Sequence, residues 1–162
     1  MERASHGFPP LVRPDSVLLV LGSFPSVMSR EAAFFYMHPQ NRFWRILSDV
    51  FGEDFAKADV AERTALLEKR KIALYDVVES CTIEGSGDAS IRDVVPSDLA
   101  GIVSCAPIGK ILVNGAKAWT LFQRHHAAYL PIAVPLPSTS PANAAMTYET
   151  LLGRWKRALL DD

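Results

Sequence analysis

One short stretch of the chain gathers side chains that could bind and transform a substrate. Residues 34–44 read FFYMHPQNRFW, so a histidine, an asparagine and an arginine stand among aromatic rings. An asparagine amide both accepts and donates hydrogen bonds, histidine is equally versatile, and arginine binds anions. Such a mixture seldom serves packing alone and is typical of a ligand pocket.

This stretch follows a segment that has the pattern of a buried strand. Residues 17–21 read VLLVL, a continuously apolar run that Gly22 ends. The pattern is typical of a strand covered on both faces in a parallel sheet. Ligands of open α/β sheets bind beyond the carboxyl ends of such strands, so we expect a pocket at residues 34–44.

Further strand-like runs predict the fold class. They lie at residues 72–78, 110–113 and 131–134, with helix-length segments between them. This alternation predicts a three-layer α/β/α sandwich around a central four-stranded parallel sheet. Helices are expected at residues 41–51, 60–70, 116–128 and 147–160, with another helix start at residues 96–98. Because neither a repeat nor a linker is evident, we expect one domain over residues 1–162.

Composition disfavours several classes of protein. No run approaches the roughly 18 apolar residues of a membrane span, and the first residues lack a signal-peptide core, so a cytoplasmic protein is expected. Cys81 and Cys105 are too few for a disulfide framework, a zinc site or an iron–sulfur cluster, and we interpret them as buried free thiols. The net charge of −1 argues against nonspecific coating of nucleic acid but leaves room for a local basic face.

Two irregular loops are expected at one edge of the sheet. GSFPS at residues 22–26 follows the first strand, and PLPSTSPAN at residues 135–143 follows the last. Proline and short polar side chains can hold such loops against a ligand. Phe24 stands where a nucleophile elbow needs its serine, and no Rossmann, P-loop or HExxH motif is present. His125 and His126 are adjacent in a predicted helix and point apart, which disfavours a shared metal.

Three motifs together resemble the uracil-DNA glycosylase superfamily: GSFPS at residues 22–26, HPQNRFW at 38–44 and LPSTS at 136–140. More narrowly, the pattern is similar to the hypoxanthine-DNA (deoxyinosine) glycosylase family, and HPQNRFW is also similar to a motif of mismatch-specific uracil glycosylases. The resemblance spans residues 17–160. It implies a uracil-DNA glycosylase-like fold and a monomeric, monofunctional DNA glycosylase without metal or other cofactor, which flips out a deaminated base and hydrolyses its N-glycosidic bond.

The resemblance assigns the central chemistry to two residues. Asn41 would position the attacking water, because Phe24 stands where many relatives carry the polar residue that does so; its alternative role is a helix cap. Tyr36 would stack on the flipped base, with core packing as its alternative. Phe43 and Trp44 are expected to anchor the following helix to the sheet.

The rest of the implied base pocket comprises Gly22, Ser23, Phe24, His38 and Asp76. Asp76 replaces an asparagine that relatives use to read the base. An ionised carboxylate would accept from a ring N–H, such as N1–H of hypoxanthine or N3–H of uracil; a salt bridge or helix cap is the alternative. For His38, contact with the base, a phosphate or the loop backbone all remain open.

DNA contacts are expected from Ser26, Arg42, Ser138, Thr139, Ser140 and Asn143. Arg42 could instead tie the loop to a carboxylate, and the serine loop could be only a proline-rich turn. Leu136 replaces the histidine that the most active uracil enzymes use, so hypoxanthine is the expected base and uracil the alternative. A noncatalytic DNA- or nucleotide-binding module and, more weakly, a small-molecule hydrolase are the other hypotheses.

Overall fold

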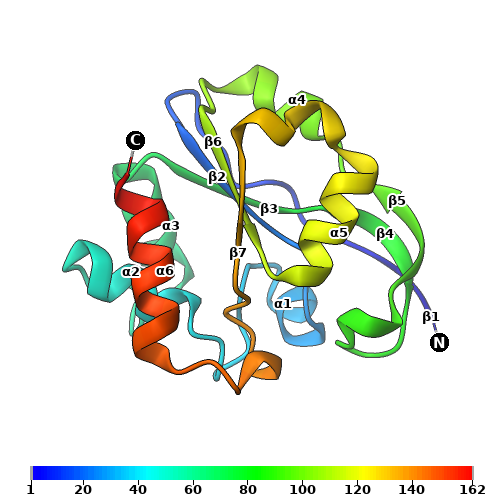
Figure 1. Ribbon diagram of the computed structural model, residues 1–162, viewed down its shortest axis with the longest axis horizontal. Helices are drawn as coiled ribbons and strands as arrows, with labels where there is room; N and C mark the ends of the chain where they lie inside the picture. The colour runs from blue at the N-terminus through cyan, green and yellow to red at the C-terminus, as the bar shows by residue number, and fades with distance from the viewer. Residues whose placement is uncertain (1, 162) are drawn as a thin grey trace.

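A four-stranded parallel sheet forms the centre of the computed structural model, which describes residues 2–161 (Figure 1). Its strand order is β3-β2-β6-β7, with β2 at Leu18–Gly22, β3 at Ile72–Asp76, β6 at Lys110–Asn114 and β7 at Ala133–Leu136. Helices α2 (Phe43–Phe51), α3 (Val60–Lys69) and α6 (Tyr148–Leu160) cover one face, and α4 (Leu99–Cys105) and α5 (Ala116–His125) lie toward the other. The predicted three-layer α/β/α class is confirmed.

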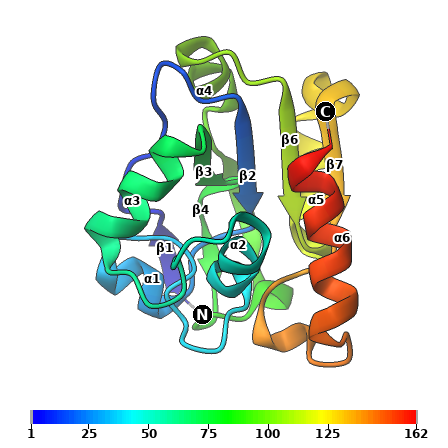
Figure 2. The ribbon, with the colours of Figure 1, turned by 90° about the vertical axis from the view of Figure 1, so that its left-hand side faces the viewer.

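The carboxyl ends of the central strands meet at one edge, which is the lower edge in Figure 2. Every residue of β2 and β3 is buried, which explains their continuous apolar runs. The short helix α1 (Val27–Ala32) lies below this edge. The segments that follow β2 and β7 lie here as well, so the fold brings together the loops that the sequence marked as polar.

A second, antiparallel sheet was not predicted. It has the order β1-β4-β5, with β1 at Glu2–Ser5, β4 at Val78–Ile83 and β5 at Arg92–Pro96. The strand predicted at residues 72–78 is present as β3, but it ends at Asp76, and Val78 already belongs to β4. Beyond β1, the N–H of His6 donates to the carbonyl of Glu79 at 2.8 Å, which carries the amino-terminal segment to the end of β3.

Local capping sets most helix boundaries close to their predicted positions. Asp98 caps α4 and Thr147 caps α6, each by accepting a backbone N–H. The last strand begins only at Ala133, because residues 127–132 form a 3₁₀ helix that the sequence did not indicate. Cys81 is buried as predicted, but Cys105 is exposed at the end of α4, so that expectation is wrong. Within residues 2–161 no helix has the length and apolar character needed to cross a membrane.

Aromatic packing fixes α2 against the sheet. Phe43 and Trp44 are 0% and 3% exposed, which confirms them as anchors. Trp44 stacks on Phe34 at 5.8 Å between ring centroids, and Phe43 meets Trp155 of α6 edge-on at 5.9 Å. Burying each ring stabilises the fold by roughly 1.5–3 kcal/mol, so the start of α2 is held firmly.

Candidate active site

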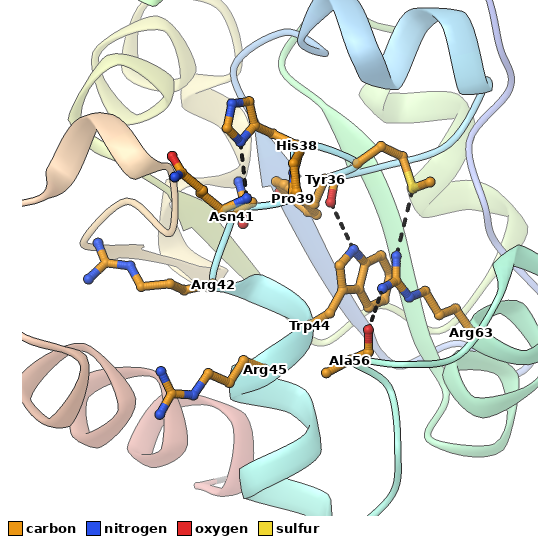
Figure 3. Close-up of a pocket in the computed structure, with 11 residues that line it drawn as sticks. Tyr36, His38, Pro39, Asn41, Arg42, Trp44, Arg45, Ala56 and Arg63 are labelled. Carbon is orange, nitrogen blue, oxygen red and sulfur yellow. Dashed lines mark hydrogen bonds between the residues drawn. The ribbon is translucent and has the colours of Figure 1, made fainter.

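The loop before α2 is held by its own hydrogen bonds. The N–H of Asn41 donates to the His38 carbonyl at 2.9 Å, and the N–H of Gln40 donates to His38 Nδ1 at 3.1 Å (Figure 3). Asn41 Oδ1 accepts the N–H of Phe43 at 2.9 Å. Loop bonding by His38, one of the alternatives considered for it, is therefore present. The N-cap of α2 is Arg42, which has no side-chain cap, and Asn41 precedes it and accepts the first helical N–H. Asn41 retains one oxygen lone pair and two amide protons for other partners.

A hollow of about 470 Å³ lies beside this loop and is lined by residues 36–42, Trp44, Arg45, Ala56 and Arg63 (Figure 3). Arg63 lies over the Trp44 ring at 4.5 Å and donates to the carbonyls of Phe55 and Ala56, both at 2.9 Å. Three guanidinium groups border the hollow, so it favours anions. Gly22, Phe24 and Asp76 do not line this hollow. The residues predicted for the base pocket therefore lie in two places, and Tyr36 belongs to both.

The second place lies where β2 and β3 end. A Cβ added to Gly22 would lie 2.5 Å from Asp76 Oδ1 and 3.1 Å from Tyr36 Oη, so both oxygens crowd the space beside this glycine. The Tyr36 ring tilts against Phe43 at 4.4 Å between centroids, and its backbone has a φ of 52°, which is unusual for an aromatic residue. Such strain is found at ligand sites. Tyr36 therefore packs on Phe43 and also lies at the pocket.

The Tyr36 hydroxyl is buried and has no hydrogen-bond partner. Burial, and then the charge of Asp76, raises the pKa of this hydroxyl above its ordinary value of 10. The amide of Asn114 lies near enough to oppose this shift, but its contact with Oη falls outside hydrogen-bonding geometry. The phenol is consequently a protonated, unused donor at neutral pH.

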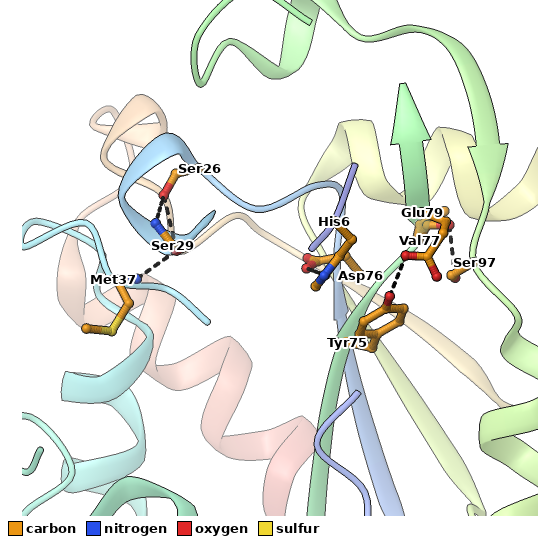
Figure 4. A network of polar contacts seen from close by, with 9 residues as sticks. All are labelled: His6, Ser26, Ser29, Met37, Tyr75, Asp76, Val77, Glu79 and Ser97. Atoms are coloured by element: carbon orange, nitrogen blue, oxygen red, sulfur yellow. Dashed lines mark hydrogen bonds and ion pairs between the residues drawn. The ribbon is translucent and has the colours of Figure 1, made fainter. Parts of the chain in front are cut away.

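Asp76 is paired with a residue outside all three motifs, His6. Asp76 Oδ2 lies 2.7 Å from His6 Nε2 (Figure 4), and both side chains are buried. The imidazole packs between Phe8 and Tyr75, with ring centroids 4.3 and 4.2 Å away. One carboxylate oxygen of Asp76 is therefore bonded within the protein, and this contact is the salt bridge considered above only when His6 is protonated. Nothing in the sequence singled out His6, because its place depends on the unpredicted sheet.

The hydroxyls of the GSFPS loop also have partners within the protein. Ser23 Oγ donates to Asp88 Oδ2 at 2.8 Å, and Ser26 Oγ caps α1 by accepting the N–H of Ser29 at 3.2 Å. Phe24 is 6% exposed and belongs to the core, where it cannot position water. Within residues 2–161 no three His, Cys, Asp or Glu side chains are grouped as metal ligands.

A closed polar pair joins β6 to the last loop. Thr139 is fully buried; its N–H donates to Asn114 Oδ1 at 3.0 Å, and Asn114 Nδ2 donates to Thr139 Oγ1 at 3.0 Å. This burial argues against the phosphate contact expected from Thr139. Sequence reasoning missed Asn114, although a polar residue directly after the apolar run ILV was the available signal.

Arg42 ties the two loops together through carbonyl oxygens rather than through a carboxylate. Its guanidinium donates to Met146 at 2.8 Å and to Asn143 at 2.9 Å, and its backbone N–H donates to Thr139 at 3.0 Å. The loop that bears Asn41 is thereby joined to the pair formed by Asn114 and Thr139. Arg42 therefore has a structural role that does not depend on contact with DNA.

The remaining serine-loop residues are half-buried and bonded to one another. Ser138 Oγ accepts the N–H of Ser140 at 3.1 Å, and Ser140 Oγ accepts the N–H of Ala142 at 3.2 Å. Asn143 Nδ2 donates to the Ser138 carbonyl at 3.0 Å. The turn alternative is therefore present, but each serine hydroxyl still has its proton to donate.

Comparisons with known proteins place this arrangement in a family. The hypoxanthine DNA glycosylase of Methanosarcina barkeri is 35% identical over 114 residues, which cover 70% of this chain and 72% of that protein. This chain belongs to the hypoxanthine DNA glycosylase family. The Methanosarcina acetivorans member is 33% identical over 114 residues, with the same shares covered. Family membership confirms the resemblance drawn from the three motifs.

A solved structure agrees with the fold of the wider uracil-DNA glycosylase superfamily. The solution structure of a candidate uracil DNA glycosylase from Methanosarcina acetivorans superposes with a TM-score of 0.80 and 28% identity, covering 94% of each chain. A scan of family models finds no match to the chain. The superfamily fold predicted from the sequence is therefore confirmed by structure as well as by relatives.

Proposed function

We propose that this protein is a DNA glycosylase that removes a deaminated base from DNA, with hypoxanthine in deoxyinosine as its principal substrate. The observation that supports this most strongly is its identity of 35% to a hypoxanthine DNA glycosylase. The site geometry is compatible, since the HPQNRFW segment lies at the carboxyl edge of the sheet beside buried, unused polar groups. A glycosylase needs such a pocket to bind a base that has left the duplex stack.

Asn41 is the residue we propose to position the attacking water. Its bond to the Phe43 N–H fixes the amide, and the free lone pair of Oδ1 can accept a proton of the water. An amide is a weak base, so Asn41 orients the water while positive charge develops on the sugar. The water adds to C1′ as the N-glycosidic bond breaks, and its proton is released while the leaving base is protonated at nitrogen.

DNA binding is proposed to involve both loops at this edge. The hydroxyls of Ser26, Ser138 and Ser140 act as hydrogen-bond acceptors within the protein, and those of Ser138 and Ser140 can still donate to phosphate oxygens. Arg42 contributes to the positive charge of the neighbouring hollow, as do Arg45 and Arg63. Thr139 is left out of this proposed contact set because it is buried.

Labelled duplexes that contain one inosine, uracil, xanthine or mismatched thymine provide the test. Each duplex is incubated with the protein and then treated with alkali, which cleaves the strand at abasic sites. The proposal expects cleavage at inosine and none in an undamaged control. Absence of cleavage in every duplex, with DNA binding intact, would instead favour a noncatalytic binding module.

Uracil is the second candidate base. It is favoured by the structural similarity to a candidate uracil DNA glycosylase. Leu136 is an apolar residue that cannot donate a hydrogen bond to the departing base, so uracil release is expected to be slower than hypoxanthine release. Initial rates on the inosine and uracil duplexes compare the two bases directly.

A further inference from the structure

The hollow beside Asn41 is bordered by positive charge (Figure 3). Within residues 2–161 no carboxylate lies within 4.0 Å of the guanidinium groups of Arg42, Arg45 and Arg63. Other arginines of the fold do pair with acids, as Arg70 does with Glu53 at 2.5 Å. Cations that gather around a cavity without a paired acid favour an anionic ligand there.

Arg63 is held in place by the fold and still has donors to offer. Its guanidinium lies over the Trp44 ring at 4.5 Å, and its Nε and Nη2 donate to the carbonyls of Phe55 and Ala56. Its Nη1 contacts only Met37 Sδ, at 3.7 Å, and a thioether is a weak acceptor. Partial burial lowers the pKa of Arg63 below its ordinary value, an effect that a bound anion would oppose. Of its five N–H bonds, at least two remain for a ligand.

Arg45 brings a second cation from the first turn of α2. Its side chain is exposed, and its guanidinium lies over the Tyr148 ring at 3.6 Å. The carboxylate of Asp49 accepts the Tyr148 hydroxyl at 2.5 Å rather than pairing with Arg45. The first turn of α2 contains no acidic residue, so the positive end of the helix dipole adds to the charge at the hollow.

The size and position of the hollow narrow the choice of anion. Its volume of about 470 Å³ is within the range of about 300–1,000 Å³ found for ligand pockets. Asn41 forms part of its wall and is the residue proposed to position water at C1′ of the flipped nucleotide. The phosphates nearest to that C1′ are the two that flank the same nucleotide. One of these is the anion that reaches the hollow when C1′ lies beside Asn41.

We propose that the hollow binds one of the two phosphates that flank the flipped nucleotide, with Arg63 as a fixed ligand and Arg45 as a second, exposed cation. A guanidinium fork matches two phosphate oxygens, and a phosphate contact fixes the register of the strand. This inference rests on the glycosylase function proposed above. It assigns the contact to two residues that lie outside the three motifs.

Removal of one phosphate charge at a time tests the contact. Duplexes carry one uncharged methylphosphonate, either beside the lesion or at distant positions, and the lesion is 2′-fluoro-deoxyinosine, whose fluorine slows hydrolysis. The wild type should lose about 10-fold in affinity at one flanking position. Arg63→Gln should lose about 10-fold on the unmodified duplex and nothing further at that position. Multiplicative losses at both flanking positions would overturn the proposal.

Two further variants control for packing and for net charge. Arg63→Gln also removes a contact with Trp44, so Arg45→Gln provides a second test from an exposed position. Arg45→Gln should lose about threefold in affinity, and this loss should vanish when the same phosphate is uncharged. Arg124→Gln removes the same charge from exposed Arg124 in α5, on the other side of the sheet, and should stay within about twofold of the wild type. Equal losses in Arg45→Gln and Arg124→Gln would show a general charge effect and overturn the site.

Titration with inorganic phosphate separates failure of this inference from failure of the proposed function. Amide shifts at Trp44, Arg45 and Ala56 are followed in isotopically labelled protein, with sodium chloride at equal ionic strength as the control. Saturable shifts with phosphate are expected in the wild type and not in Arg63→Gln, even if no duplex releases a base. Shifts without any methylphosphonate coupling would overturn the DNA contact and assign the hollow to free phosphate. Neither shifts nor coupling, while inosine duplexes are cleaved, would overturn the site and leave the glycosylase activity standing.

Discussion

Two buried polar clusters at the same edge of the sheet differ in one respect. Asn114 and Thr139 satisfy each other through two hydrogen bonds of 3.0 Å. The Tyr36 hydroxyl and the Asp76 side chain are also buried, yet the hydroxyl has no partner and Asp76 bonds through only one oxygen. The polar groups of the closed cluster are paired within the protein and join β6 to the last loop. The open cluster keeps its hydrogen-bonding capacity for something else, which is what a binding site requires.

Asn41 is intermediate between the two clusters, because its Oδ1 accepts one hydrogen bond, from the Phe43 N–H, and can accept a second. Asn41→Ala should abolish both the hydrogen bond to the Phe43 N–H and the water contact, with a loss of about 1,000-fold in base release and about 1 kcal/mol in unfolding free energy. Asn41→Ser should recover the stability, since a serine hydroxyl can also accept the Phe43 N–H, but not the activity. Single-turnover excision and chemical denaturation measure the two effects. Recovery of activity by Asn41→Ser would show that Asn41 serves only to hold the start of α2.

Gly22→Ala should fill the open cluster. The new methyl group would lie 2.5 Å from Asp76 Oδ1, so the carboxylate must move. A displacement of about 1 Å at such a site costs about 100-fold in rate, which is the loss expected in kcat/KM on inosine DNA. Gly153→Ala is the control, because nothing lies within 4 Å of its Cβ in α6. That variant should keep full activity, and parallel losses in both variants would argue against a site beside Gly22.

Thr139→Val should break the closed cluster and act on stability first. Valine keeps the shape but leaves Asn114 Nδ2 buried without its acceptor, at a cost of about 2 kcal/mol in unfolding free energy. Thermal unfolding followed by circular dichroism measures this change. Unchanged stability would mean that the hydrogen bonds between Asn114 and Thr139 do not stabilise the fold.

His126 provides the smallest expected effect and lies outside both clusters. Burial lowers its pKa below the ordinary value of 6.5, so the unfolded chain binds more protons than the folded chain as the pH falls past this value. The contribution of neutral His126 is complete above pH 6.5 and is lost at lower pH. The melting temperature of the wild type should therefore fall more steeply on acidification than that of His126→Gln. Parallel curves would contradict this assignment.

The closed and open clusters were not equally accessible to sequence reasoning. The parallel sheet could be predicted because strands buried on both faces leave continuous apolar runs such as residues 17–21. The partnership of His6 with Asp76 could not, because it depends on β1 pairing with β4 across more than 70 residues of chain. Thr139 shows the converse, since a hydroxyl in a polar loop looks exposed until Asn114 is placed opposite it.

Chromatographic detection of the released base tests the central claim most directly. Wild-type protein is incubated with two duplexes that are identical except for deoxyinosine or deoxyadenosine at one position. The open cluster beside Gly22 predicts release of free hypoxanthine from the first duplex and no adenine from the second. Release of no base, or of both bases at similar rates, would contradict the account of this edge as a pocket for deaminated bases.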